Sequence, residues 1–198
     1  MESTAAPGLG LSIINLERKT LPGPEYLHDL INWSCTSVDA IEFWSASGDI
    51  CRLSYKALDE QTSILADQIL KTLGSVKDDR EDIIVPVLIS QSPELYISWI
   101  AVLKAGAAFC PVAIDVPAER LKFILKDVSA SLVLTTHQHE KLLATIAPKI
   151  RVLSISQSTL GSSVCASSRR GSDKHRDIRL RPESLAYVMY TSGQFYLN

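Results

Sequence analysis

The stretch that decides the fold runs from residue 83 to residue 112 and reads IIVPVLISQSPELYISWIAVLKAGAAFCPV. It opens with Ile83–Ile89, a continuous apolar run that is short and rich in β-branched side chains. Such a run is typical of a strand buried on both faces of a sheet. Pro86 lies inside the run and has no N–H to donate to a neighbouring strand, so we expect this strand to avoid a central position.

A helix and a second strand follow within the same stretch. Ser92-Pro93-Glu94 predicts a helix start, with a capping hydroxyl, a proline at the first helical position and an acid in the first turn. The helix should run to about Lys104 and end at Gly106. Because it is apolar almost all round, it should be largely buried. Ala107–Val112 then predicts a strand, which completes a strand–helix–strand unit.

The alternation continues beyond this unit. Glu119–Val128 and His139–Ala147 have the apolar spacing of helices, and Ser131–Thr135 and Arg151–Ile155 are short runs typical of strands. Strands that alternate with helices form a mostly parallel sheet with helices packed on it. The sequence therefore predicts an α/β fold.

The part of the chain before residue 83 has a different pattern. Glu25–Trp33 is spaced as a short amphipathic helix, and Ala40–Ala46 and Ile50–Leu53 predict two strands joined by a hairpin turn. Ser54 is a candidate N-cap for a helix that ends at Gly74. We expect residues 1–24 to be a loose arm, residues 25–198 to form one partial domain, and residues 156–181 to be a basic loop rich in Ser and Gly.

Composition limits the classes of function. The 198 residues carry a formal net charge of -2, which gives no argument for a nucleic-acid partner or an anionic membrane surface. No apolar run approaches the roughly 18–20 residues that span a bilayer, and the N-terminus lacks the pattern of a secretory signal. We therefore expect a cytoplasmic protein without nucleic-acid or membrane partners.

Cysteine and histidine residues do not predict a metal site. Cys35, Cys51, Cys110 and Cys165 lie far apart, as expected of incidental thiols in a reducing compartment. His137 and His139 flank one residue, but no further ligands with suitable spacing accompany them. We assign no metal ligand.

The C-terminal stretch contains the candidate site. Leu185–Tyr190 is a short apolar run that predicts a buried strand. Thr191, Ser192 and Gly193 follow as a turn into a small, hydroxyl-bearing loop. Such loops often hold phosphate, because glycine lets the backbone approach an anion while N–H groups and hydroxyls bond it.

Three stretches in this order resemble one family. LSYKAL at residues 53–58 is similar to the L-[ST]-Y-x-x-L opening of adenylate-forming enzymes. LKAGAAF at 103–109, continuing to Pro111, and LAY–YTSG at 185–193 resemble core motifs of the amino-acid adenylation domains of nonribosomal peptide synthetases. The Phe109-Cys110-Pro111 start and the displaced Asp115 resemble the first adenylation domain of fungal ferrichrome-type siderophore synthetases.

The resemblance implies ATP-dependent activation of an amino acid as an acyl-adenylate, with ATP and Mg²⁺ as cofactors. It implies that Thr191 and Ser192 contact phosphate and that Gly193 makes the turn. We carry over no catalytic residue and no metal ligand. The family continues the loop as T-S-G-[ST]-T-G-x-P-K-G, whereas this chain has Gln194, Phe195 and Tyr196 and ends before the lysine.

These departures predict an incomplete N-terminal subdomain of the adenylate-forming fold that lacks the C-terminal lid domain and is inactive alone. Two alternatives stay open: a non-catalytic module that docks on other parts of a peptide synthetase, and the product of a shortened gene model. A dinucleotide-binding domain is disfavoured because no G-x-G-x-x-G follows a strand. We also expect self-association through apolar surface left uncovered around Trp99 and Val188–Tyr190.

Overall fold

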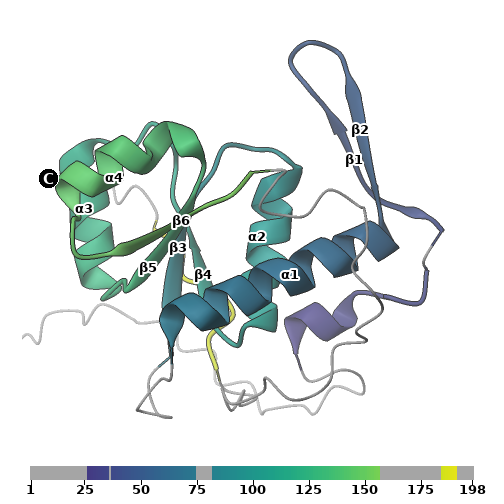
Figure 1. Ribbon diagram of the computed structural model, residues 1–198, viewed down its shortest axis with the longest axis horizontal. Helices are drawn as coiled ribbons and strands as arrows, with labels where there is room; N and C mark the ends of the chain where they lie inside the picture. The colour runs from purple at the N-terminus through teal and green to yellow at the C-terminus, as the bar shows by residue number, and fades with distance from the viewer. Residues whose placement is uncertain (1–25, 36, 75–81, 157–183, 191–198) are drawn as a thin grey trace, which may run out of the picture.

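A computed structural model describes residues 26–35, 37–74, 82–156 and 184–190 (Figure 1). In chain order its elements are η1 (Leu27–Leu30), β1 (Asp39–Trp44), β2 (Ile50–Ser54), α1 (Tyr55–Leu73), β3 (Ile84–Leu88), α2 (Pro93–Lys104), β4 (Ala108–Pro111), α3 (Ala118–Asp127), β5 (Leu132–Thr135), η2 (His137–His139), α4 (Glu140–Ile146) and β6 (Arg151–Ser154). Within the described residues, no helix is long and apolar enough to cross a membrane.

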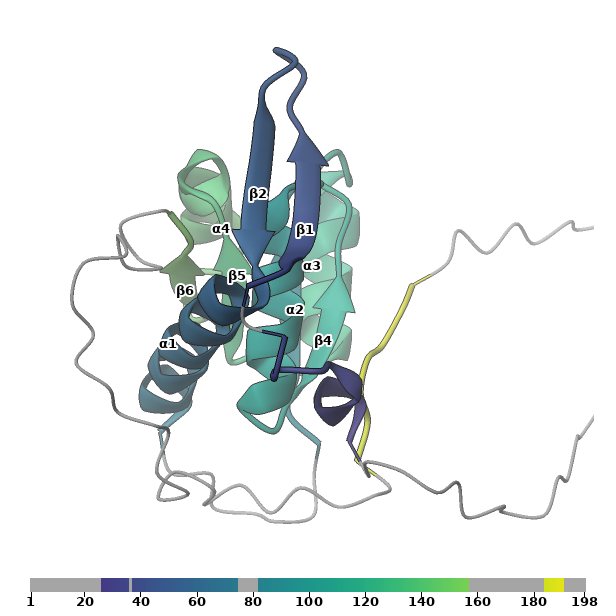
Figure 2. The same cartoon turned by 90° about the vertical axis from the view of Figure 1, so that its right-hand side faces the viewer.

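The sheet confirms the predicted α/β fold. Strands β3, β4, β5 and β6 form a four-stranded sheet in the order β4-β3-β5-β6, and every pair in it is parallel. Strands β1 and β2 pair separately as an antiparallel hairpin, as predicted. The hairpin projects away from the sheet and its helices (Figures 1 and 2).

The position of β3 shows that the expectation drawn from Pro86 was wrong, because β3 lies inside the sheet between β4 and β5. The carbonyl of Val87 accepts a bond from the amide of Val112 (3.0 Å), so Val87 faces β4 and Pro86, one residue earlier, faces β5. The ladder with β5 involves only Val87 and Leu88, which follow the proline. β3 can lie inside the sheet despite Pro86 because its pairing with β5 begins at Val87, one residue after the proline.

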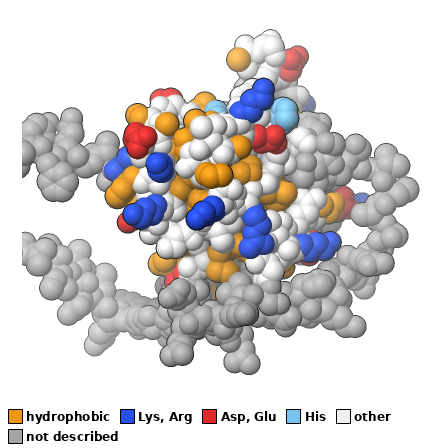
Figure 3. Space-filling model, turned by 60° about the vertical axis from the view of Figure 1, so that its left-hand side comes forward, with side chains coloured by type: hydrophobic (Ala, Val, Ile, Leu, Met, Phe, Trp, Pro, Cys, Tyr) orange, Lys and Arg blue, Asp and Glu red, His pale blue; other side chains and the backbone are white. Residues whose placement is uncertain are grey.

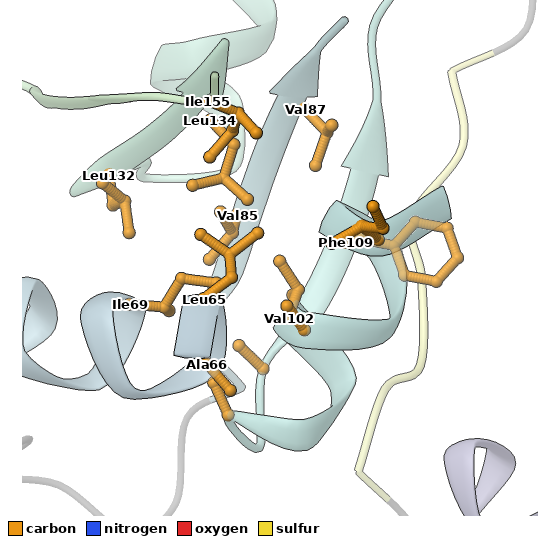
Figure 4. Packing of buried hydrophobic residues seen from close by; sticks show 14 of the residues in the cluster. Leu65, Ala66, Ile69, Val85, Val87, Val102, Phe109, Leu132, Leu134 and Ile155 are labelled. Atoms are coloured by element: carbon orange, nitrogen blue, oxygen red, sulfur yellow. The ribbon is translucent and has the colours of Figure 1, made fainter. Parts of the chain in front are cut away.

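Helices α1 and α2 cover one face of the sheet and form the larger core with it (Figure 4). The strands contribute every second residue to this core, as a pleated strand must. The side chains that meet there include Leu65, Ile69, Val85, Val87, Val102, Phe109, Leu132 and Leu134.

Helices α3 and α4 cover the opposite face. The strand residues that alternate with those of the first core point to this side. The second core contains Leu88, Cys110, Leu121, Ile124, Leu125, Val133 and Leu143. The molecule thus has three layers, with the sheet between two pairs of helices.

Helix α1 confirms the predicted start and stop. The Ser54 hydroxyl accepts a bond from the Ala57 amide (3.2 Å), which satisfies one of the N–H groups that a helix start leaves open. Gly74 ends the helix with a positive φ of 73°, a conformation that favours glycine. Thr62 is buried among the apolar residues, and its hydroxyl donates a hydrogen bond to the Leu58 carbonyl (2.7 Å).

Helix α2 is buried or half-buried along its whole length, as predicted. Pro93 and Glu94 occupy its first turn, but the Ser92 side chain makes no capping bond. The predicted capping hydroxyl is therefore wrong, although Ser92 holds the cap position. Gly106, with φ 74°, turns the chain from the helix end toward β4.

Lys104 ties the end of α2 to α1. Its ammonium group lies 2.5 Å from a carboxylate oxygen of Asp59 and 3.1 Å from the Ser63 hydroxyl. The same group lies 4.3 Å from the ring centroid of Trp33, a cation–π distance. Burial lowers the pKa of Lys104, while the hydrogen bond to Asp59 acts in the opposite direction. These contacts fix the helix that precedes β4.

Two expected elements differ from the structure. The segment that was expected to form an amphipathic helix at residues 25–33 contains only the short 3₁₀ helix η1, which buries no residue. Residues 184–190 run extended beside β4 but make a single bridge, between Phe109 and Tyr187, instead of a strand. These residues lie at the outer side of β4, where three of the seven are exposed and none is fully buried, so the predicted buried strand is wrong.

The first prediction concerns the larger core. Leu65 is fully buried, so Leu65→Ala should lower the free energy of unfolding by about 2–5 kcal/mol through lost burial and a residual cavity. Leu30→Ala, at a residue that is 63% exposed, is the matched control and should change it by less than about 0.5 kcal/mol. Urea denaturation followed by circular dichroism measures both. Equal effects of the two substitutions would contradict the described core.

Candidate functional site at the carboxyl edge of the sheet

The parallel strands bring several loops to one edge of the sheet. β3, β4, β5 and β6 all point the same way, so their carboxyl ends lie together. The bridge between Phe109 and Tyr187 is also parallel, and the segment beside β4 therefore ends at this edge with Tyr190. Figure 2 shows the segment running alongside β4 in the same direction. In open α/β sheets, ligands bind outside the carboxyl ends of the strands.

The three predicted site residues, Thr191, Ser192 and Gly193, lie outside the described residues. Their assignment as phosphate contacts stays a prediction. What the structure places is the residue before them, Tyr190, and the way in which it is held.

Tyr190 is anchored on the outer side of α3. Its hydroxyl donates a hydrogen bond to the Asp127 carboxylate, and the Arg120 guanidinium lies 5.7 Å from its ring centroid. Arg120 also lies 5.3 Å from the ring of Phe123 on the same helix. Partial burial, followed by the hydrogen bond to Asp127, raises the pKa of Tyr190 to about 12. The start of the candidate loop is thus fixed by contacts with one helix.

The other face of the same segment is held by stacked aromatic rings. Tyr187 stacks on Phe109, with ring centroids 5.8 Å apart, and Phe109 stacks on Trp99 of α2 at 5.1 Å. The Phe109 amide donates to the Ala186 carbonyl (3.2 Å), and the Val188 amide donates to the Phe109 carbonyl (3.0 Å). Phe109 is therefore the residue on which the segment aligns.

The described loops at this edge carry no basic side chain that could offset the charge of a triphosphate. Residues 89–92, 112–117, 136–139 and 155–156 connect the strands to the next element and contain hydroxyl groups and imidazoles but no Lys or Arg. A phosphate chain requires N–H groups or cations that offset its charge. On the face shown in Figure 3, basic side chains are scattered singly, with acidic ones among them. We therefore assign no step of a reaction to this edge.

A cluster of His137, Glu140 and Ser154 also lies here. Glu140 accepts hydrogen bonds from Ser154 and from His137. Both lower the pKa of Glu140, the bond from Ser154 more than the bond from His137. The His137 ring nitrogen lies 3.0 Å from the carboxylate. Because the carboxylate lies between serine and histidine, the imidazole is not placed to take the serine proton as a catalytic triad requires. Among the described residues, no group of His, Cys, Asp and Glu could hold a metal ion.

Three of the four cysteines lie in the part of the chain that the structure describes. Cys35, Cys51 and Cys110 are free, and Cys165 lies outside the described residues. Burial raises the pKa of Cys110 to about 11, so this thiol stays protonated near neutral pH. Cys110 is thus a buried, protonated thiol of the second core.

The fold and this edge define a class: a three-layer α/β domain whose outermost described segment ends at the carboxyl edge of a parallel sheet. Residues 34–193 match the family described as AMP-binding enzyme. The chain belongs to this family.

Comparison with curated proteins points to one group of relatives. The chain is 39% identical over 190 residues to nonribosomal peptide synthetase SIDC of Beauveria bassiana, covering 96% of this chain and 4% of that protein. It is 36% identical over 194 residues to nonribosomal peptide synthetase sidC of Arthroderma benhamiae, covering 98% and 4%. The chain therefore spans about one twenty-fifth of the length of these relatives.

A solved structure supports the fold. The acyl-CoA synthetase of Brucella canis superposes with a TM-score of 0.56 over 79% of this chain and 29% of that chain. Its sequence identity of 18% makes this a likeness of fold alone. The resemblance drawn from the three sequence motifs is confirmed by the family match and by these relatives.

The Asp127–Tyr190 contact had no signal in the sequence that we used. The sequence placed Tyr190 only at the end of an apolar run and in the YTSG motif, and it predicted no role for Arg120 or Asp127. Residues that lie on one face of α3 three and seven positions apart, as Arg120, Phe123 and Asp127 do, mark a place where another side chain can dock. Only the fold shows that Tyr190 is that side chain.

The second prediction uses the pKa of Tyr190. Because the folded-state pKa is about 12 and the ordinary value is 10, the folded protein holds this proton more tightly than the unfolded chain. Its contribution to stability is complete below pH 10 and is lost as the pH rises toward 12. The free energy of unfolding should therefore fall more steeply over this range in the parent protein than in Tyr190→Phe.

Urea denaturation at a series of pH values measures the free energy of unfolding of both proteins. Taking the difference between them cancels the titration of all other groups. Asp127→Asn, which removes the accepting carboxylate, should reduce the steepness of the parent curve. If the parent and Tyr190→Phe lose stability in parallel, Tyr190 is not anchored as described.

Proposed function

We propose that this chain is the N-terminal part of an amino-acid adenylation domain of a nonribosomal peptide synthetase, of the siderophore-producing ferrichrome type. The observation that carries the proposal is the anchoring of Tyr190 at the carboxyl edge of the sheet, where ligands bind in open α/β folds. Thr191, Ser192 and Gly193 follow Tyr190 directly in the sequence. The family match over residues 34–193 and the peptide synthetases among the relatives support it.

The parent reaction joins the carboxylate of an amino acid to the α-phosphate of ATP, with release of pyrophosphate bound to Mg²⁺. In this chain, the Thr191 and Ser192 hydroxyls would donate hydrogen bonds to phosphate oxygens. Gly193 would let the backbone approach the anion closely. Tyr190, Asp127 and Arg120 would keep the start of the loop in place.

We further propose that the chain does not catalyse this reaction unaided. Gln194, Phe195 and Tyr196 stand where the family has a hydroxyl residue, a threonine and a glycine. Phe195 and Tyr196 are bulky residues where a phosphate loop needs small ones, so the backbone cannot wrap closely around an anion there. The described loops at the same edge contain no Lys or Arg, and the Arg120 guanidinium beside them lies against the rings of Phe123 and Tyr190.

The third prediction is an absence of pyrophosphate exchange. The purified chain, supplied with ATP, Mg²⁺ and either one of the twenty common amino acids or hydroxy-ornithine, should give exchange at the level of a blank without enzyme. An intact adenylation domain in the same assay is the positive control. Calorimetric titration with ATP and Mg²⁺ should show no binding. Robust exchange, or tight ATP binding, would refute the proposed inactivity.

A second candidate function is a non-catalytic module of the cytoplasm that docks on other parts of a peptide synthetase. The observation that favours it is the packing of both faces of the sheet, which gives residues 37–156 cores of their own. A pull-down of separately expressed synthetase segments by the tagged chain tests this function. Failure of every segment to bind removes the candidate.

A further inference from the structure

The segment beside β4 leaves one edge of the sheet unpaired. Ala186 and Val188 bond to Phe109, so their backbone groups face β4. In an extended chain, successive residues direct their N–H and C=O groups to opposite sides. The backbone groups of Leu185, Tyr187 and Met189 therefore face away from the sheet, and among the described residues none of them makes a hydrogen bond.

The same three residues expose their side chains. Leu185 is 47% exposed, Tyr187 53% and Met189 61%, whereas Val188 and Tyr190 pack against the core beneath α3. The uncovered apolar surface is thus on the face of α1 and α2. Within the expected range Val188–Tyr190, Met189 is uncovered, whereas Val188 and Tyr190 are packed. Trp99, which was also expected to be uncovered, is covered by Phe109 and is half-buried.

Nothing in this segment protects the edge. Natural edge strands are shielded by lysine, by proline, by bulges or by a covering element. Residues 184–190 contain no charged residue and no proline. Leu185, Tyr187 and Met189 thus combine free backbone groups with exposed apolar side chains.

We propose that this edge pairs with the same edge of a second copy of the chain. The two segments would run antiparallel around a two-fold axis at Tyr187, which places Leu185 of each copy opposite Met189 of the other. In this register Leu185, Tyr187 and Met189 of one copy would lie opposite Met189, Tyr187 and Leu185 of the other. Such pairs exchange both backbone bonds, which gives about six hydrogen bonds between the copies.

A second copy fits this edge better than an unrelated strand because the segment is complementary to itself. A two-fold interface brings the same patch of both copies together and requires that no like charges meet. Every opposed pair here is apolar, and the side chains of both copies lie on the same face of the joined sheet. Tyr187 meets Tyr187 at the axis, and aromatic pairs of this kind stabilise antiparallel strands.

The fourth prediction tests this pairing in the full 198-residue chain. Sedimentation analysis should show a concentration-dependent dimer for the parent protein. In Leu185→Lys/Met189→Lys, each new lysine would face a lysine of the other copy, and the dissociation constant should rise at least about tenfold. The matched control is Val38→Lys/Ile114→Lys, which adds the same charge at residues that are 55% and 45% exposed. It should dimerise like the parent.

A charge reversal tests the register. In Leu185→Lys/Met189→Glu, each lysine would face a glutamate of the other copy, so dimerisation should recover relative to the double-lysine variant. In the parent protein, the amides of Leu185, Tyr187 and Met189 should gain protection from hydrogen exchange as the concentration rises, which needs no variant. A monomeric parent, equal loss of dimer in the control, or no recovery with the charge reversal overturns the proposal.

Discussion

The rest of the structure depends on the burial of β3 on both faces. Val85 and Val87 point into the core under α1 and α2, and Leu88 points into the core under α3 and α4. All three are almost fully inaccessible, and each buried side chain of this size contributes roughly 1.5–3 kcal/mol. A strand in this position requires helices on both sides and parallel neighbours, which the connecting helices provide. The three layers and the shared carboxyl edge follow from it.

The end of the described chain is held by the same arrangement. Phe109, one strand away from β3, receives Tyr187 on one face and aligns Val188 through the backbone. Tyr190 then reaches the opposite face and bonds to Asp127. The segment is thus fixed from both sides of the sheet, while its outer backbone edge pairs with none of the residues that the structure describes. The two consequences are a defined starting point for the candidate loop and an open edge.

Most predictions with a local determinant are confirmed, although the capping bond of Ser92 and the helix at residues 25–33 are not. The capping hydroxyl of Ser54, the glycines that end α1 and α2, and the hairpin between β1 and β2 depend on residues close together in the chain. Sequence patterns were less reliable where a partner decides the outcome. Pro86 argued for an edge position, and Leu185–Tyr190 for a buried strand, because neither pattern says which strand lies alongside. β5 pairs with β3 only after Pro86, which allows β3 to lie inside the sheet. Tyr187 faces solvent, so Leu185–Tyr190 is not a buried strand.

By itself, the sequence determined the alternation of strands and helices and the family, because apolar periodicity and short motifs are properties of consecutive residues. It also determined that Gln194, Phe195 and Tyr196 replace the small residues of a phosphate loop. Only the tertiary structure decided that Tyr190 lies against Asp127 and that, among the described residues, the backbone groups of Leu185, Tyr187 and Met189 have no hydrogen-bond partner. The physical reason is that both facts join residues far apart in the chain, and no local pattern records which of them meet.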